Sequence, residues 1–226
     1  MRLPTRLPGI SAALAAVRRA LFPGSVAYWE RRYADGGTSG LGSYGELAQF
    51  KASVLNRFVV EHSIRSVIEF GCGDGNQLML CHYPRYVGLD VSRSAITRCL
   101  KRFGNDSSKS FFWYDPQCFA DRTGVFRADL AVSLDVLYHL VEDAVYEDYL
   151  RRLFAAADRW AVIYSTNEDR ASQEPHVRHR RFAAWINQWQ PEFRLHQVIS
   201  HSDGPSGSTA DFHFYQRTGI TPIIPP

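Results

Sequence analysis

The stretch Glu69-Phe70-Gly71-Cys72-Gly73-Asp74-Gly75 decides the fold of this chain. Residues 66–70 form a short apolar run, and the glycines that close it predict a buried strand that enters a tight turn and then a helix. Glycine allows the backbone to approach a ligand where a side chain would exclude it. Ligands of doubly wound sheets bind at the carboxyl ends of the strands, so this loop is the first candidate binding site.

Four further apolar runs follow the glycine loop, and each is preceded by a segment that can form a helix. These runs occupy residues 86–90, 110–114, 130–135 and 159–165. Two late runs, 193–199 and 211–217, are joined by a loop rich in Gly, Ser and Pro, which predicts an antiparallel hairpin at the sheet edge. We therefore expect an α/β fold with a doubly wound, Rossmann-like sheet of seven strands, mostly parallel, an antiparallel last strand and helices on both faces.

Two helices are expected before the first strand. The apolar residues of 47–58 share one helical face, and Ser43 with Glu46 forms a capping box, so a helix should begin near residue 44. Further upstream, the spacing of apolar residues over 14–21 favours a packed or interfacial N-terminal helix over a cleaved targeting peptide.

Composition limits the class of protein. The 226 residues are 45% hydrophobic and 22% charged, which is typical of a soluble globular chain. A net charge of +3 gives little support for polynucleotide binding, and no apolar run reaches the length of a membrane span. The four cysteines form no CxxC pair, which favours reduced thiols in the cytoplasm over a disulfide framework or a metal site.

The spacing around the glycine loop distinguishes between two cofactors. A dinucleotide fingerprint needs a third glycine at position 76, where this chain has Asn76. Asp90, which ends the second strand 19 residues past Gly71, can accept hydrogen bonds from two ribose hydroxyls. Over residues 44–217 the chain resembles the class I S-adenosylmethionine (SAM) dependent methyltransferases of small-molecule or glycan type, whose first motif is an acid followed by three alternating glycines.

That resemblance implies SAM as the cofactor and assigns part of its site. The glycines border the methionine part of SAM, and Asp90 holds the ribose. Asp115 matches an acid that approaches the adenine amino group, although Pro116 departs from the usual pattern and Asp115 could simply begin a turn. The implied cofactor-binding residues are Glu69, Gly71, Gly73, Gly75, Asp90 and Asp115.

The carboxyl end of the fourth strand carries the candidate catalytic groups. Asp135 and His139 follow that strand and are expected near the transferred methyl group. Methyl transfer needs an acceptor held in line, and a hydroxyl acceptor must also lose its proton, whereas a carboxylate or phosphate is already anionic. His139 is the candidate base, with a structural histidine as the equal alternative. Tyr138 is expected either to shape the acceptor pocket or to pack in the core.

Two other segments are candidates for binding. Residues 36–45 contain five glycines and predict a lid over SAM, with Arg32 and Tyr33 as contacts, or else a flexible connector. Residues 174–181 are the densest positive cluster and suit an anionic acceptor, or else form a solvated surface. The acceptor contacts expected there are His176, Arg178, His179 and Arg180.

The function expected from these features is O-methylation of a small molecule or of a sugar or glycan, in an anionic or nucleotide-linked form, as in tailoring of a polysaccharide or secondary metabolite. Residues 1–43 would then form N-terminal helices and a glycine-rich cap, and 44–226 the SAM-binding domain, within one domain overall. Nucleic acid is not an expected partner, because Asp115-Pro116 continues as Gln117-Cys118 and lacks the segment of amino-methylating DNA enzymes. The alternatives are a nucleic-acid or protein methyltransferase, and a non-catalytic SAM-binding regulatory or scaffold protein. Self-association through the N-terminal helix is a further expectation.

Overall fold

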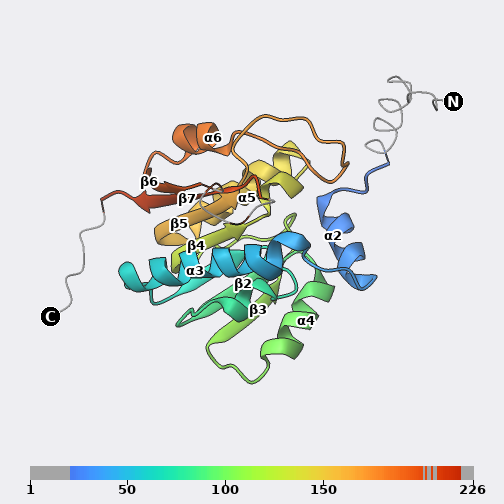
Figure 1. Cartoon of the computed structure of the whole chain (residues 1–226), viewed down its shortest axis with the longest axis horizontal. Coiled ribbons are helices and arrows are strands. Elements are labelled where there is room, and N and C mark those ends of the chain that lie inside the picture. The colour runs from blue at the N-terminus through green and yellow to red at the C-terminus, as the bar shows by residue number, and fades with distance from the viewer. Residues whose placement is uncertain (1–20, 201, 203–204, 206–207, 220–226) are drawn as a thin grey trace.

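The computed structural model describes residues 21–200, 202, 205 and 208–219, and in them a seven-stranded sheet of order β3-β2-β1-β4-β5-β7-β6 forms the centre (Figure 1). Strands β1 to β5 run parallel, and β7 lies antiparallel to both β5 and β6. The expected fold class is therefore confirmed. The strands are β1 (Val67–Phe70), β2 (Tyr86–Asp90), β3 (Lys109–Trp113), β4 (Ala128–Leu134), β5 (Ala157–Ser165), β6 (Phe193–Ile199) and β7 (Asp211–Arg217).

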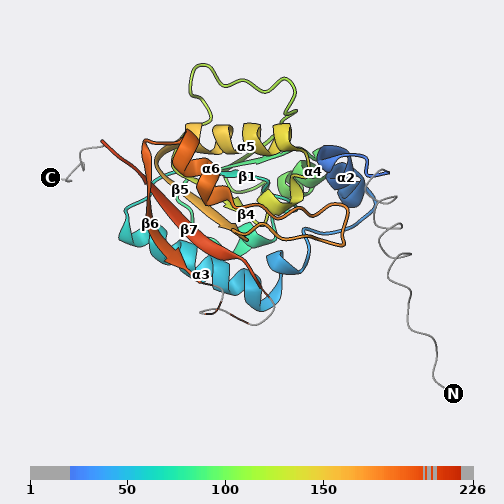
Figure 2. The same cartoon turned by 90° about the horizontal axis from the view of Figure 1, so that it is seen from above.

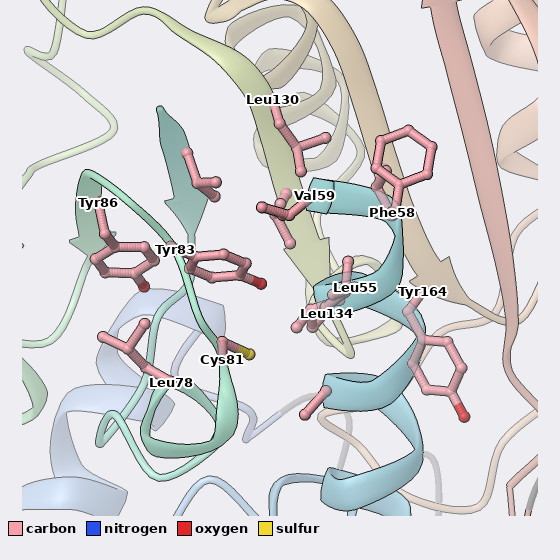
Figure 3. Packing of buried hydrophobic residues seen from close by; sticks show 14 of the residues in the cluster. Leu55, Phe58, Val59, Leu78, Cys81, Tyr83, Tyr86, Leu130, Leu134 and Tyr164 are labelled. Atoms are coloured by element: carbon pink, nitrogen blue, oxygen red, sulfur yellow. The ribbon is translucent and has the colours of Figure 1, made fainter. Parts of the chain in front are cut away.

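Helices cover both faces of the sheet. Figure 2 shows α5 (Asp143–Ala155) and α6 (Phe182–Trp189) on one face and α3 (Gly45–Glu61) on the other. On the α3 side, Leu55 and Val59 pack with Leu130 and Leu134 of β4 in one buried apolar cluster (Figure 3). Helix α2 (Ser25–Ala34) contacts α4 (Arg93–Phe103). The expected N-terminal helix falls mostly on residues 1–20, which lie outside the described residues.

Three local expectations are wrong. The glycine loop leads into a short 3-10 helix, Gln77–Leu80, instead of the expected α-helix. Only ten residues, one of which is Pro84, separate the loop from β2, and this leaves little room for a longer helix. No helix forms over 114–127, where Asp121 accepts hydrogen bonds from two backbone amides and holds a loop instead. Helix α3 begins near residue 44 as expected, but its N-cap is Tyr44 and no side chain caps it, so Ser43 and Glu46 form no capping box.

Candidate active site

The carboxyl ends of β1, β2 and β4 meet at a cleft. Its wall includes Gly71 and Gly73 after β1, Asp90 at the end of β2, and Asp135 and His139 after β4. Because these three strands are neighbours in the sheet, residues far apart in the sequence are brought to one edge, as the strand pattern predicts.

The glycine loop has a backbone that only glycine adopts freely. Gly71 and Gly73 have φ angles of 79° and 58°. A Cβ at Gly71 would lie 2.6 Å from a methyl carbon of Val136, and one at Gly73 would lie 2.4 Å from Ser39 Oγ. Both the conformation and the space therefore require glycine at these two positions.

Two buried carboxyl groups stand beside this loop. Asp90 accepts hydrogen bonds from the Gly73 amide at 2.9 Å and the Ser92 amide at 2.8 Å, and burial raises its pKa to about 6. A carboxylate offers about four acceptor positions, so roughly two of those of Asp90 stay available to a ligand in the cleft. Glu69 accepts a hydrogen bond from Tyr86 Oη at 2.6 Å, and burial raises its pKa to about 7.

Asp115 is not part of the cleft wall. Its Oδ1 accepts a hydrogen bond from the Gln117 amide at 2.9 Å, within a turn closed by backbone bonds to its own carbonyl. The wall at this end is formed by Tyr114, Pro116 and Arg152, and Arg152 donates to the Pro116 carbonyl. Asp115 therefore begins a turn, which the sequence analysis gave as the alternative to a contact with adenine.

The glycine-rich segment 36–45 lies against the glycine loop. The Ser39 amide and Tyr44 Oη donate to Asp74 Oδ2 at 3.0 and 2.8 Å, and the Asp74 amide donates to Ser39 Oγ at 3.1 Å. Tyr33 lies in the cleft wall with its hydroxyl 2.9 Å from Ser39 Oγ. Arg32 lies outside the wall and donates through Nε to the carbonyl of Thr38 within the same segment.

His139 sits in the cleft in one defined tautomer. Its Nδ1 lies 3.2 Å from the carbonyl oxygen of His176, and because a carbonyl only accepts, Nδ1 must donate and Nε2 carries the lone pair. The rings of Trp29 and His176 pack against it, with centroids 4.8 and 5.5 Å away. Burial lowers the pKa of His139 to about 4, so the ring is neutral at physiological pH.

Tyr138 and the positive cluster are used within the protein. Tyr138 donates through its hydroxyl to Asp135 Oδ1 at 2.8 Å, and its ring does not line the cleft. Arg178 and Arg180 both donate to the carbonyl of Val141 and pair with Asp143.

The histidines of the same cluster also stay outside the cleft wall. His179 Nδ1 lies 2.7 Å from Thr166 Oγ1, and His176 stacks on Tyr28 with a centroid separation of 4.6 Å. Arg178 and Arg180 thus connect loop 174–181 to the residues after β4, and their guanidinium groups donate hydrogen bonds to the protein itself.

Several wall residues were missed by the sequence reading. Ser25, Val26 and Trp29 of α2 line the cleft, and the buried Lys51 of α3 pairs with Asp135. The lone lysine in an otherwise apolar helical face was a visible signal for the last of these. Within the described residues there is no cluster of three or more possible metal ligands. None of the helices in this part of the chain is long and apolar enough to span a membrane.

Comparison with known proteins shows the family of the chain. A family model described as a methyltransferase domain matches residues 44–203. The N-methyltransferase NodS of Bradyrhizobium japonicum WM9, solved with S-adenosyl-L-homocysteine, superposes with a TM-score of 0.68 at 17% identity, covering 86% of this chain and 99% of that one. Magnesium protoporphyrin IX methyltransferase (ChlM) of Synechocystis PCC 6803, with bound SAM, gives 0.60 at 12% identity, with coverages of 95% and 100%.

A third structure, the methyltransferase domain of bacterial CtHen1, gives a TM-score of 0.59 at 18% identity, covering 75% of this chain and 97% of that one. At such identities the likeness shows a common fold, and the acceptor of each enzyme remains its own. No curated protein matches the sequence.

Proposed function

The chain belongs to the methyltransferase domain family, and from that premise we propose that it transfers the methyl group of SAM to a hydroxyl of a small molecule or sugar. The family match and the fold confirm the resemblance to class I SAM-dependent methyltransferases. One observation carries the proposal: a glycine loop, a carboxylate with spare acceptor positions and a neutral histidine share a single cleft.

The cleft fits the chemistry of SAM. Asp90 has acceptor positions for the ribose hydroxyls, and Gly71 and Gly73 lie in the cleft wall, where the methionine part can border their backbone. Tyr114 and Pro116 offer apolar surface for a flat ring. Carboxyl groups of Glu69 and Asp90 in the wall suit a cationic sulfonium, which supplies the electrophilic methyl group.

The step itself is a displacement in which the S–CH3 bond breaks, an O–CH3 bond forms and sulfur keeps the electron pair. His139 Nε2 accepts a hydrogen bond from the attacking hydroxyl and so directs a lone pair of that oxygen at the methyl carbon. The methylated oxygen is a strong acid, so a base with a pKa of about 4 suffices to take its proton as the bond forms. Asp135, in the same cleft wall, holds the acceptor as well.

The acceptor is expected to carry an O–H rather than an ionised oxygen. The proposed acceptor-binding groups, Asp135 and neutral His139 through Nε2, are hydrogen-bond acceptors, so they pair with an O–H and not with an ionised carboxylate or phosphate. Arg178 and Arg180, which suggested an anionic acceptor, donate their hydrogen bonds within the protein. A neutral sugar or metabolite hydroxyl is therefore the favoured class.

The proposal is tested by incubating the protein with methyl-labelled SAM and separate candidate acceptors: neutral glycosides, nucleotide sugars, polysaccharide, RNA and protein. We expect label in a neutral hydroxyl compound and none with Asp90→Ala. Label in RNA or protein would favour the nucleic-acid or protein methyltransferase alternatives. SAM binding by calorimetry with no transfer to any acceptor would favour the regulatory or scaffold alternative.

The organisation into a cap, residues 1–43, and a SAM-binding domain, residues 44–226, also stays a prediction. The cap proposal is supported by α2, which lines the cleft, and by segment 36–45, which contacts the glycine loop. The cytoplasmic location and self-association through the N-terminal helix are likewise predictions, and the latter concerns residues outside the described part of the chain.

A further inference from the structure

Lys51 is fully buried in α3 and its ammonium has one carboxylate partner in reach. The side chain has no exposed surface, and Nζ lies 2.6 Å from Asp135 Oδ2, with the ring of Tyr164 5.4 Å away. Of the three lysines in the chain, Lys101 is exposed and Lys109 pairs locally with Asp106. Burying an ammonium is costly, and such a pair is often no more stabilising than apolar residues in its place. Stability alone therefore does not explain Lys51.

Asp135 is fixed from three segments of the chain. Lys51 holds Oδ2, and Tyr138 donates to Oδ1 at 2.8 Å. Gly42, in the glycine-rich segment, lies so close that a Cβ there would be 2.8 Å from Oδ2. These contacts leave the carboxylate one position.

The backbone of Asp135 is also unusual. Its φ angle is 58°, a left-handed conformation that costs energy for any residue other than glycine. Only Ser63 shares this feature among the non-glycine residues that the structure describes. Asp135 follows the carboxyl end of β4 and is a residue of the cleft wall, as is His139. An ion pair that only joined a helix to the sheet would need neither the strained backbone of Asp135 nor its position in the cleft wall.

We infer that Lys51 is a positioning residue of the methyl-transfer site: its buried ammonium, with Tyr138, holds the Asp135 carboxylate where it accepts a hydrogen bond from the acceptor. The inference rests on the proposed function and adds a second group to its acceptor side. With neutral His139 in the same cleft wall, Asp135 gives the site two acceptors of hydrogen bonds. A sugar carrying two neighbouring hydroxyls can donate to both groups at once, so one hydroxyl is aligned for attack and the other anchors the ring.

Three variants test the role of Lys51: Lys51→Met, Asp135→Asn, and the two combined. We expect each to keep the SAM affinity of the wild type within about threefold and to lose at least 100-fold in kcat with the acceptor found by label transfer. The combined variant removes both charges without leaving either unpaired, so it should regain the thermal stability that Lys51→Met loses, yet not its turnover. Lys101→Met is the matched control and should behave as wild type.

The outcomes separate the two proposals. If the combined variant regains both stability and turnover, Lys51 and Asp135 form only a structural ion pair and the inference is wrong. Unchanged kcat in Lys51→Met would overturn the inference directly, while the wild type still transfers methyl groups. If the wild type labels no acceptor, the proposed function fails and the inference with it. Tyr138→Phe removes only the hydroxyl that donates to Asp135 Oδ1, and it should lower kcat about tenfold. An unchanged kcat in this variant would also count against the inference that Asp135 must be held in position.

Discussion

The two halves of the cleft are built in different ways. The cofactor half consists of backbone and one carboxylate at the ends of adjacent strands: the glycine loop after β1 and Asp90 after β2. The acceptor half draws single side chains from α2 and from the turn after β4. Two groups outside the wall hold these side chains: Lys51 of α3 pairs with Asp135, and the His176 carbonyl accepts from His139. A site made of local backbone is encoded in a short motif, whereas a site made of convergent side chains is not. Mutations in the cofactor half should therefore lower SAM affinity, and mutations in the acceptor half should lower kcat.

The largest effect is expected in the acceptor half, from His139→Ala. Loss of the hydrogen-bond acceptor for the attacking hydroxyl should lower kcat by roughly 10²- to 10³-fold. The ring packs against Trp29 and His176, so SAM affinity by calorimetry should change less than about fivefold. Turnover equal to that of the wild type would leave His139 as a structural histidine.

In the cofactor half, Asp90→Ala should weaken SAM binding by about 100-fold. The change removes two charge-assisted hydrogen bonds to ribose and releases the Gly73 amide that Asp90 orders. Asp115→Ala is the control, since that carboxylate lies in a turn outside the cleft wall. Calorimetry at pH 7.5 measures both variants, and equal losses would restore Asp115 as an adenine contact.

A third comparison uses pH and the burial of His139. Its pKa falls from 6.5 to about 4 on folding, so the unfolded chain binds more protons between these values and stability is lost as the pH drops below about 6.5. For this one group the loss between pH 7.5 and pH 5 is about 2 kcal/mol. Urea unfolding of the wild type and His139→Gln at both pH values measures it. The wild type should lose about that much more than the variant, and parallel losses would show that His139 titrates normally.

The smallest effect concerns the positive cluster. Arg180 has a side chain that is 12% exposed and donates to the carbonyls of Leu140 and Val141. Arg180→Gln should therefore cost about 1–2 kcal/mol of folding free energy and leave the acceptor KM unchanged, while the exposed Arg181→Gln should change neither. Unfolding curves and a KM measurement distinguish the two roles. A raised KM at unchanged stability would restore an anionic acceptor site at 174–181.

The same contrast explains what the sequence could predict. The glycine motif after the first strand and Asp90 at the end of the second can be recognised in the sequence. The structure shows why Gly71 and Gly73 are needed there, because both have positive φ angles and no space for a side chain. The pairing of Lys51 with Asp135 depends on how α3 packs against β4, which no local pattern specifies. Likewise, an Arg-rich loop has the same composition whether its guanidinium groups face a substrate or the carbonyls of Leu140 and Val141.

The glycine-rich segment 36–45 spans both halves. Its Ser39 and Tyr44 bind Asp74 in the glycine loop, while its Gly42 lies against the carboxylate of Asp135. If this segment opens as the predicted lid, a movement that breaks the contacts of Ser39 and Tyr44 would also draw Gly42 away from Asp135, so cofactor entry and the state of the acceptor site would be coupled. In kinetic terms this favours a compulsory order, in which SAM binds first and the demethylated cofactor leaves last.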